Sequence, residues 1–333
     1  MLPAYRAVVV LFLALVIAAF LQAEGLRKQA QVQPQGMQRR VALAVTRPLV
    51  RVSRALHLTT PRHELQVAIG REDEDRIDTQ VHLSLPPPAG PLPTRRPKPS
   101  TRPSTRKPAA ASKPVFTRAR PLRVWVAGDS LAEVPGQALE RLDRLPIDVV
   151  GVESRLSTGL TRPDLYNWFT RIQQAPRELK PDVAVLSFGA DDAHDYIAGV
   201  PAGRTVGPLG SPSWDAEYRR RVDGVTRELN AQGIYVVWLG LPIPDRHGFL
   251  RSFPVVNRIL ESVAKAHARH STFVDTWHLL DDFHGRYTPY LRVHGKLTLM
   301  RLSDGVHYTA AGGDLIAAQL VEQLRRVYTL RST

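Results

Sequence analysis

The feature that most limits the possible folds is a regular alternation of short apolar runs with helical segments, which begins at Leu122. Five runs have the length and the nearly continuous apolar character of buried strands: 122–128, 147–153, 181–189, 234–242 and 272–277. Segments with helical spacing follow them: 133–142, 163–175, 214–233, 253–270 and 309–328. Apolar strands separated by helices form a parallel sheet with both faces covered. The pattern therefore predicts one α/β domain over 122–330.

The distribution of charge narrows the classes of function. The 333 residues carry a net charge of +14, yet residues 24–121 alone hold 19 Lys and Arg against 7 Asp and Glu. Residues 122–333 hold 25 against 24, so the α/β domain is nearly neutral. A nucleic-acid-binding domain would carry its basic charge on a face of the folded unit. We therefore expect no nucleic-acid partner. The absence of cysteine excludes a disulfide scaffold, a cysteine–zinc site and a thiol nucleophile.

An uncharged apolar run, AVVVLFLALVIAAFL, occupies residues 7–21. With Gln22 and Ala23 it reaches roughly 25 Å as a helix, the short end of a membrane span. Arg6 precedes it, as in a signal peptide or signal anchor, and the bulky Leu21 makes cleavage after Ala23 unfavourable. We expect residues 1–23 to be an uncleaved transmembrane signal anchor, with a removed signal peptide as the alternative.

Residues 24–121 differ in character from both flanking regions. Eleven prolines fall within residues 86–121, which predicts an extended chain, and residues 71–78 (REDEDRID) form a mixed charge run. Residues 41–58 are more apolar and could form a short helix or strand. We expect a basic, disordered linker overall. It could bind an anionic surface such as phospholipid headgroups or an acidic envelope polymer, or serve only as a spacer.

Polar residues capable of nucleophilic catalysis stand where strands of the predicted sheet end. Ser130 follows the first strand in the sequence GDS, and Asp304 and His307 stand together before the last helix in DGVHYT. A serine hydroxyl becomes a useful nucleophile when a base takes its proton. His307 could be that base, and Asp304, three residues earlier, could hold the other ring nitrogen. The oxyanion would need donors, which could come from the Ser130 N–H, a glycine N–H after the second strand and a side chain after the third.

These motifs resemble the SGNH (GDSL-type) hydrolase superfamily. GDS, the G-x-x-D after the third strand (189–192) and DGVHYT occur in the expected order. The motifs STGL-x-RPD (157–164), W-x-x-x-Y-x-x-RV (214–222) and WLGLP (238–242) are similar to a bacterial, membrane-anchored subfamily. The resemblance covers about residues 122–328. It implies a flavodoxin-like three-layer α/β/α sandwich with strand order 2-1-3-4-5. It also implies Ser130 as nucleophile, Gly159 as oxyanion glycine, Asp304 as orienting acid and His307 as base, with no cofactor.

One position departs from the family pattern. The third block of the family reads Gly-x-Asn-Asp, and its Asn side chain donates to the oxyanion, whereas this chain has Asp191 there. An ionised carboxylate cannot donate and would repel the developing negative charge. Asp191 could be protonated because of burial or of Asp192. His194 could donate in its place, or catalysis could be weak or absent.

Simpler interpretations compete with each assignment. Ser130 could be a helix N-cap, His307 an ordinary loop histidine and Gly159 a plain turn glycine. Asp191, Asp192, His194 and Asp195 could suggest a metal site, but a solvated polar loop explains them better, and we expect no metal.

The expected function is that of an extracytoplasmic serine esterase or O-acyltransferase that forms an acyl-serine. O-acetyl esters of envelope glycans are the expected substrates, by family analogy and position. The chain would be a single-pass protein of the bacterial cytoplasmic membrane, with its catalytic domain periplasmic or extracellular. The alternative is a catalytically weakened scaffold that binds glycan or protein while tethered to the membrane.

Overall fold

The computed structural model describes residues 4–32, 37–58, 60, 61, 64, 79–81, 113–201 and 205–331. The chain divides into two compact units, Met1–Thr79 and Gln80–Thr333. The prolines of 86–112 and the charge run of 71–78, which carried part of the linker prediction, lie outside the described residues.

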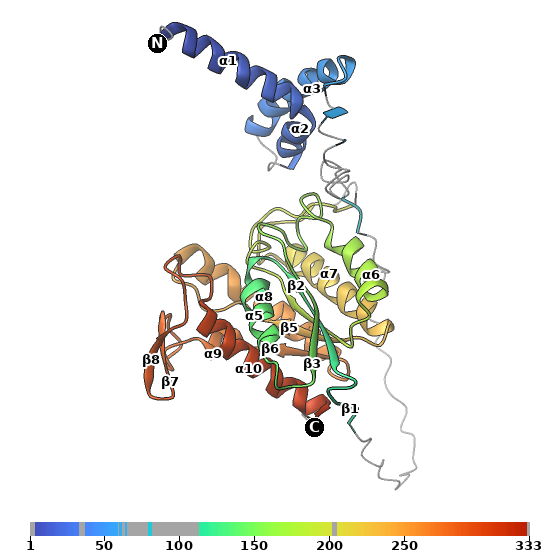
Figure 1. The fold of residues 1–333 in the computed structure, drawn as a ribbon, viewed down its shortest axis with the longest axis vertical. Helices are drawn as coiled ribbons and strands as arrows, with labels where there is room; N and C mark the ends of the chain where they lie inside the picture. Colours follow the sequence, from blue (N-terminus) through green and yellow to red (C-terminus); the bar gives the residue numbers. More distant parts are fainter. Residues whose placement is uncertain are drawn as a thin grey trace. The chain divides into compact units, whose positions relative to one another are not determined.

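The larger unit is built on a five-stranded parallel sheet (Figure 1). Its strands are β2 (Leu122–Gly128), β3 (Ile147–Ser154), β4 (Val183–Ser187), β5 (Tyr235–Leu239) and β6 (Ser271–Val274). They lie in the order β3-β2-β4-β5-β6, and every neighbouring pair is parallel. Counted along the chain, this is the predicted order 2-1-3-4-5.

Helices cover both faces of this sheet. The first layer holds α5 (Glu133–Glu140) and α10 (Ala310–Val327), which pack against each other. The second layer holds α6 (Trp168–Leu179), α7 (Pro212–Ala231) and α8 (His247–Ala266), each in contact with the next. The predicted three-layer α/β/α sandwich is therefore confirmed. Since all strands are parallel, their carboxyl ends, and the loops that follow them, meet at one edge of the sheet.

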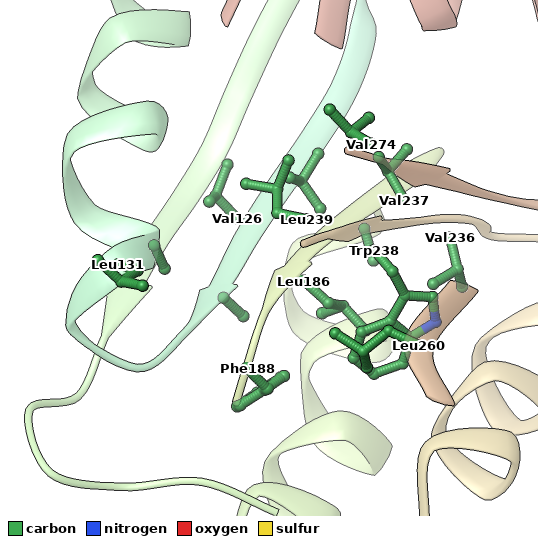
Figure 2. Packing of buried hydrophobic residues seen from close by; sticks show 14 of the residues in the cluster. Val126, Leu131, Leu186, Phe188, Val236, Val237, Trp238, Leu239, Leu260 and Val274 are labelled. Atoms are coloured by element: carbon green, nitrogen blue, oxygen red, sulfur yellow. The ribbon is translucent and has the colours of Figure 1, made fainter. Parts of the chain in front are cut away.

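The core forms where the strands present apolar side chains to both layers. Val126, Leu186, Val237 and Leu239 come from three adjacent strands, and Figure 2 shows them packed near one another. Trp238 is also fully buried, and its indole N–H donates to the Thr226 hydroxyl at 3.1 Å. The apolar runs are nearly continuous because both faces of each strand are covered.

Several small elements complete this unit. These are β1 (Val115–Phe116) with β9 (Thr329–Leu330), the 3-10 turn η1 (Ser130–Ala132), α9 (Thr276–Leu279), and the antiparallel hairpin of β7 (Tyr290–Val293) and β8 (Lys296–Leu299). The pairing of β1 with β9 places residues 115–116 in the folded unit, ahead of the boundary predicted at residue 122.

The smaller unit contains α1 (Ala4–Leu21), α2 (Ala23–Val32) and α3 (Met37–Ala55). These helices contact one another, and the Ser53 hydroxyl donates to the Phe20 carbonyl oxygen at 2.6 Å. The helix α3 agrees with the short helix or strand considered for residues 41–58, whereas α2 lies in residues predicted only as disordered linker. The prolines and charges that suggested disorder follow this segment, whereas residues 41–50 are apolar enough to pack.

No single helix among the described residues is long and apolar enough to cross a membrane. Val8–Leu21 and Ala23–Ala30 meet the length and composition requirements only when taken together, as a pair bent by 74°. The straight transmembrane helix predicted over residues 1–23 is thus not shown.

Candidate active site

The turn after β2 presents Ser130 through a backbone shape that requires glycine. Gly128 has φ of +155°, and a Cβ at that position would overlap the Ser187 carbonyl oxygen of the neighbouring strand. Asp129 then caps η1, because its Oδ1 accepts the Leu131 N–H at 3.0 Å. The N-cap role considered for Ser130 belongs to Asp129, and the Ser130 hydroxyl is left for another partner.

That partner is His307. Its Nε2 lies 2.8 Å from Ser130 Oγ, and its Nδ1 lies 2.7 Å from Asp304 Oδ2. The side chains of His307 and Asp304 are 37% and 35% exposed, so the site is open to a substrate. The structure thus brings together three residues separated by up to 177 positions in the sequence, in the arrangement of a serine hydrolase triad.

The Asp304 carboxylate is held ready to orient the imidazole. Its Oδ1 accepts the backbone N–H groups of Val306 at 2.8 Å and His307 at 2.9 Å. Although burial acts to raise it, these N–H groups and the His307 ring lower the pKa of Asp304 to about 2. Asp304 therefore remains ionised at neutral pH and can stabilise an imidazolium.

A buried arginine holds the loop that carries Asp304 and His307. The Arg301 guanidinium donates to the carbonyl oxygens of Ile243 and Val306, both at 2.8 Å, and of Gly305 at 3.2 Å. Its side chain is almost fully buried. Since Ile243 follows β5, these bonds tie the triad loop to the neighbouring strand end.

The loop after β3 supplies the predicted oxyanion glycine. Within the described part of the chain, neither the Gly159 N–H nor the Ser130 N–H has a hydrogen-bond partner, so both are available as donors. A Cβ at position 159 would overlap the Asp192 carboxylate, so the close approach of this carboxylate requires glycine there.

Asp192 fixes the segment that carries Gly159. Its Oδ1 accepts both the N–H and the hydroxyl of Thr161 at 2.7 Å, and its Oδ2 accepts the Tyr218 hydroxyl at 2.9 Å. Asp192 is fully buried. A carboxylate with three donors is well satisfied, so Asp192 joins the loop after β3 to the loop after β4 and to α7.

Asp191 occupies the position where the family pattern has asparagine. Burial and the charge of Asp192 raise the pKa of its carboxyl, while the Ser157 N–H and the nearby His307 act to lower it. The net direction is upward, so the neutral acid of Asp191 persists to higher pH than that of an ordinary aspartate. A neutral carboxyl can donate a hydrogen bond, which an ionised one cannot.

His194 does not offer a replacement donor. Its Nδ1 accepts the Tyr196 N–H at 3.1 Å, which leaves the proton on Nε2. Nε2 lies 3.2 Å from the Thr161 hydroxyl, whose own proton goes to Asp192. Burial also lowers the pKa of His194 and keeps it neutral. Both ring nitrogens are engaged, and the suggestion that His194 serves the oxyanion is contradicted.

A third carboxyl, that of Asp129, lies beneath the nucleophile. Its Oδ2 accepts the N–H groups of Gly189 and Ala190, both at 3.0 Å, which joins the nucleophile turn to the loop after β4. Burial, with the charges of Asp191 and Asp192, raises the pKa of Asp129 to about 8, although the Leu131 and Ala190 N–H groups oppose this. Asp129 and Asp191, both with raised pKa values, therefore lie near the Asp192 carboxylate on the side of the site that holds Gly159, which we call the oxyanion side.

All five residues predicted from the sequence lie in the loops at the carboxyl edge of the sheet or in the loop before α10. The triad residues are in direct contact, and Gly159 and Asp191 border the same carboxyl cluster. The sequence reasoning gave no role to Asp129, Thr161, Tyr218 or Arg301. Tyr218 had a signal, because it closes the W-x-x-x-Y motif.

Among the described residues, no group of three or more His, Cys, Asp or Glu side chains is arranged to hold a metal ion.

A family model described as "Protein of unknown function (DUF459)" matches residues 123–323. The chain belongs to this family. No curated protein matches it. The matched range contains every triad residue and all five strands of the sheet except the first residue of β2.

Solved structures with similar folds include a lipase/acylhydrolase from Enterococcus faecalis, with 16% identity and a TM-score of 0.44 over 63% of this chain and 98% of that one. A GDSL-like lipase from Bacteroides thetaiotaomicron has 16% identity and a TM-score of 0.42 over 65% and 92%. An acetylxylan esterase from Geobacillus stearothermophilus, solved as a catalytic mutant, has 14% identity and a TM-score of 0.40 over 61% and 93%. The resemblance to SGNH hydrolases is confirmed by the strand order and by the location of the Ser-Asp-His group in this chain.

Proposed function

We propose that this protein is a serine esterase or O-acyltransferase that acts through an acyl-serine at Ser130. The proposal rests on two hydrogen bonds of the His307 ring. Its Nε2 lies 2.8 Å from Ser130 Oγ, and its Nδ1 lies 2.7 Å from Asp304 Oδ2. Both distances lie within the reach that a nucleophile, its base and an orienting acid require.

The first half of the reaction forms the acyl-enzyme. Ser130 Oγ attacks the ester carbonyl carbon while His307 Nε2 takes the hydroxyl proton, and Asp304 stabilises the resulting imidazolium. When the tetrahedral intermediate collapses, the bond from carbon to the alcohol oxygen breaks. The departing alcohol takes the proton from His307, and the acyl group remains on Ser130.

The second half releases the acyl group. Water, in a hydrolase, or a sugar hydroxyl, in a transferase, attacks the acyl-serine while His307 again accepts a proton. Collapse returns that proton to Ser130 Oγ and frees the acid or the new ester. The N–H groups of Ser130 and Gly159 would donate to the oxyanion in both halves, joined by Asp191 in its neutral form.

The substrate class and the location complete the proposal. We infer O-acetyl esters of envelope glycans as substrates, with the protein held in the bacterial cytoplasmic membrane by its N-terminal helices and the α/β unit on the outer side. The apolar, largely exposed α1 supports the attachment, since Leu11, Phe12 and Leu15 each expose more than half of their surface. An anchored domain would meet the envelope polymer nearest the membrane.

The decisive experiment compares the full chain with Ser130→Ala in detergent, using release of the alcohol from a small aryl acetate. Loss of the nucleophile should lower kcat by on the order of 10⁴–10⁶-fold. Ser262→Ala is the matched control. Among the described residues, this α8 hydroxyl bonds to the Ile259 carbonyl oxygen of its own helix and to Arg219. Equal rates for Ser130→Ala and the parent chain would exclude catalysis by this serine.

The acidic side chain of Asp191, at the position where the family pattern has asparagine, favours a second function. If its carboxyl is ionised at the working pH, the oxyanion side repels negative charge, and the fold would serve as a membrane-tethered module that binds glycan or protein. The pH profile of Asp191→Asn separates this function from the first.

A further inference from the structure

Helix α3 has one face that is covered by its neighbours in the smaller unit. Val50 is almost fully buried, and Ser53 is fully buried and donates to the backbone of α1 at Phe20. Thr46, one turn before Val50, is buried as well. These residues mark the face of α3 that packs against the other two helices.

The opposite face of α3 is apolar and exposed. Val41, Val45 and Val52 expose 56, 63 and 44% of their surface, and Met37 before them is exposed as well. Their spacings of four and seven residues place them in one stripe along the helix. Val50 lies nine residues from Val41, which is half a turn around the helix axis at about 100° per residue.

A row of arginines runs beside this apolar stripe. Arg40, Arg47 and Arg51 are exposed and are spaced by seven and four residues, so they also share one side of the helix. Arg40 directly precedes Val41, and Arg51 directly precedes Val52. One residue turns the helix by about 100°, so the basic row borders the apolar stripe without interrupting it.

We propose that α3 lies in the surface of an anionic bilayer, with the stripe of Met37, Val41, Val45 and Val52 among the acyl chains and the arginine row at the level of the lipid phosphates. This arrangement is typical of helices that lie in the membrane interface. The inference deepens the proposed attachment of this protein to the membrane, on which it rests.

The arginine row indicates what binds the exposed face of α3. A second copy of α3 would bring its own arginine row against the first, and Pro48, which lies within the apolar stripe, does not suit a helix pair. Anionic lipid supplies the opposite charge along the whole row. Arg54 is not counted in this row, because its guanidinium pairs with Glu24 at 2.5 Å.

The absence of cysteine makes the test direct, since any introduced cysteine is unique. The full chain would carry one environment-sensitive fluorophore at Val45→Cys in the stripe, at Leu15→Cys in α1, or at Gln29→Cys as the control. Gln29 is exposed on α2, which packs on the side of α3 away from the stripe. Each protein is placed in vesicles of phosphatidylcholine, with or without an equal amount of phosphatidylglycerol.

The expected result is a shift of the Val45 probe to shorter emission wavelengths in the phosphatidylglycerol vesicles. Its quenching by spin-labelled lipid should be several-fold stronger than that of the Gln29 probe, which should stay open to iodide. Replacing the row with Arg40→Gln, Arg47→Gln and Arg51→Gln should remove most of the Val45 shift in these vesicles. The Leu15 probe should be quenched by lipid in every case.

Three results would overturn the inference. One is a Val45 probe that stays open to iodide while the Leu15 probe is in lipid. Another is a Val45 shift that is equal in both kinds of vesicle. The last is a shift that depends on protein concentration rather than on lipid, which would indicate self-association. A Leu15 probe that stays in water while the Val45 probe enters lipid would refute the proposed α1 anchor and leave the α3 inference supported.

Discussion

The two sides of the candidate active site differ in how they handle charge. On the triad side, Asp304 is ionised, and the His307 ring lies between its carboxylate and the Ser130 hydroxyl. On the oxyanion side, three acidic groups are close together, and the pKa values of Asp129 and Asp191 are raised. The first side can activate a nucleophile at neutral pH without further adjustment, whereas the second depends on which carboxyl is protonated.

Catalysis has two requirements, a reactive serine and donors to the oxyanion, and the GDS and DGVHYT motifs concern only the first. A triad makes the serine reactive, but the rate also depends on donors aimed at the oxyanion. Here two backbone N–H groups are free to donate, and the third donor of the family pattern is replaced by an acid. We therefore expect the oxyanion side to limit the rate.

Among the variants that keep Ser130, Asp304→Asn should lower kcat most. The amide cannot stabilise the imidazolium and disturbs the ring tautomer, so kcat should fall by about 10⁴-fold. Steady-state hydrolysis of an aryl acetate measures the change. Asp314→Asn, which removes only an exposed carboxylate paired with Arg141, should leave the rate unchanged. A loss of less than tenfold in Asp304→Asn would mean that this carboxylate does not serve His307.

Asp191→Asn should raise activity, and the gain should grow with pH. A carboxyl with a raised pKa donates while it is protonated, below that pKa, and loses this ability as the pH rises through it. The amide donates at every pH, so the ratio of kcat/KM between variant and parent should approach about 10²–10³ at the alkaline end.

Asp191→Ala is the control, since it removes the charge without adding a donor. Its kcat/KM should lie between that of the parent and that of Asp191→Asn. If Asp191→Asn is less active than the parent at every pH, the aspartate has a role of its own, and the idea that it weakens an esterase fails. A ratio that stays constant with pH would show that Asp191 does not titrate in this range.

Tyr218→Phe should have the smallest effect and should act through position. It removes one donor from the buried Asp192 carboxylate, which should lower the free energy of unfolding by about 1.5–3 kcal/mol. Gly159 should then be held less firmly, and kcat should fall by less than about 10²-fold. Urea titration and steady-state kinetics on the same samples measure the two effects.

Tyr235→Phe removes a hydroxyl at the start of β5, at the edge of the sheet opposite the site, and should lower stability without lowering kcat of the folded protein. If the two tyrosine variants lose kcat equally, Tyr218 has no special relation to the oxyanion loop.

The same contrast extends to the two units of the chain. In the larger unit, the repeated apolar runs require a covered parallel sheet, so its fold and strand order follow from local patterns and the family resemblance. In the smaller unit, the linker region contains α2, which was not predicted, and α3, which overlaps the short helix or strand considered for residues 41–58. Their few apolar residues gain burial only by packing on one another and on α1. The hairpin of β7 and β8 was likewise not predicted, since its short strands lack a continuous apolar run.

The amino-acid pattern is sufficient to predict the α/β class, the position of Ser130 after the first strand of the sheet, and the pairing of Asp304 with His307 on one loop. These depend on apolar periodicity and on neighbours a few residues apart, which a sequence displays directly. The contacts of Asp192 with Thr161 and Tyr218, of Asp129 with the loop after β4, and of His194 with Thr161 arise only in the folded chain. The protonation of buried carboxyls depends on burial and on charges brought together from distant strands, and neither exists until the chain has folded.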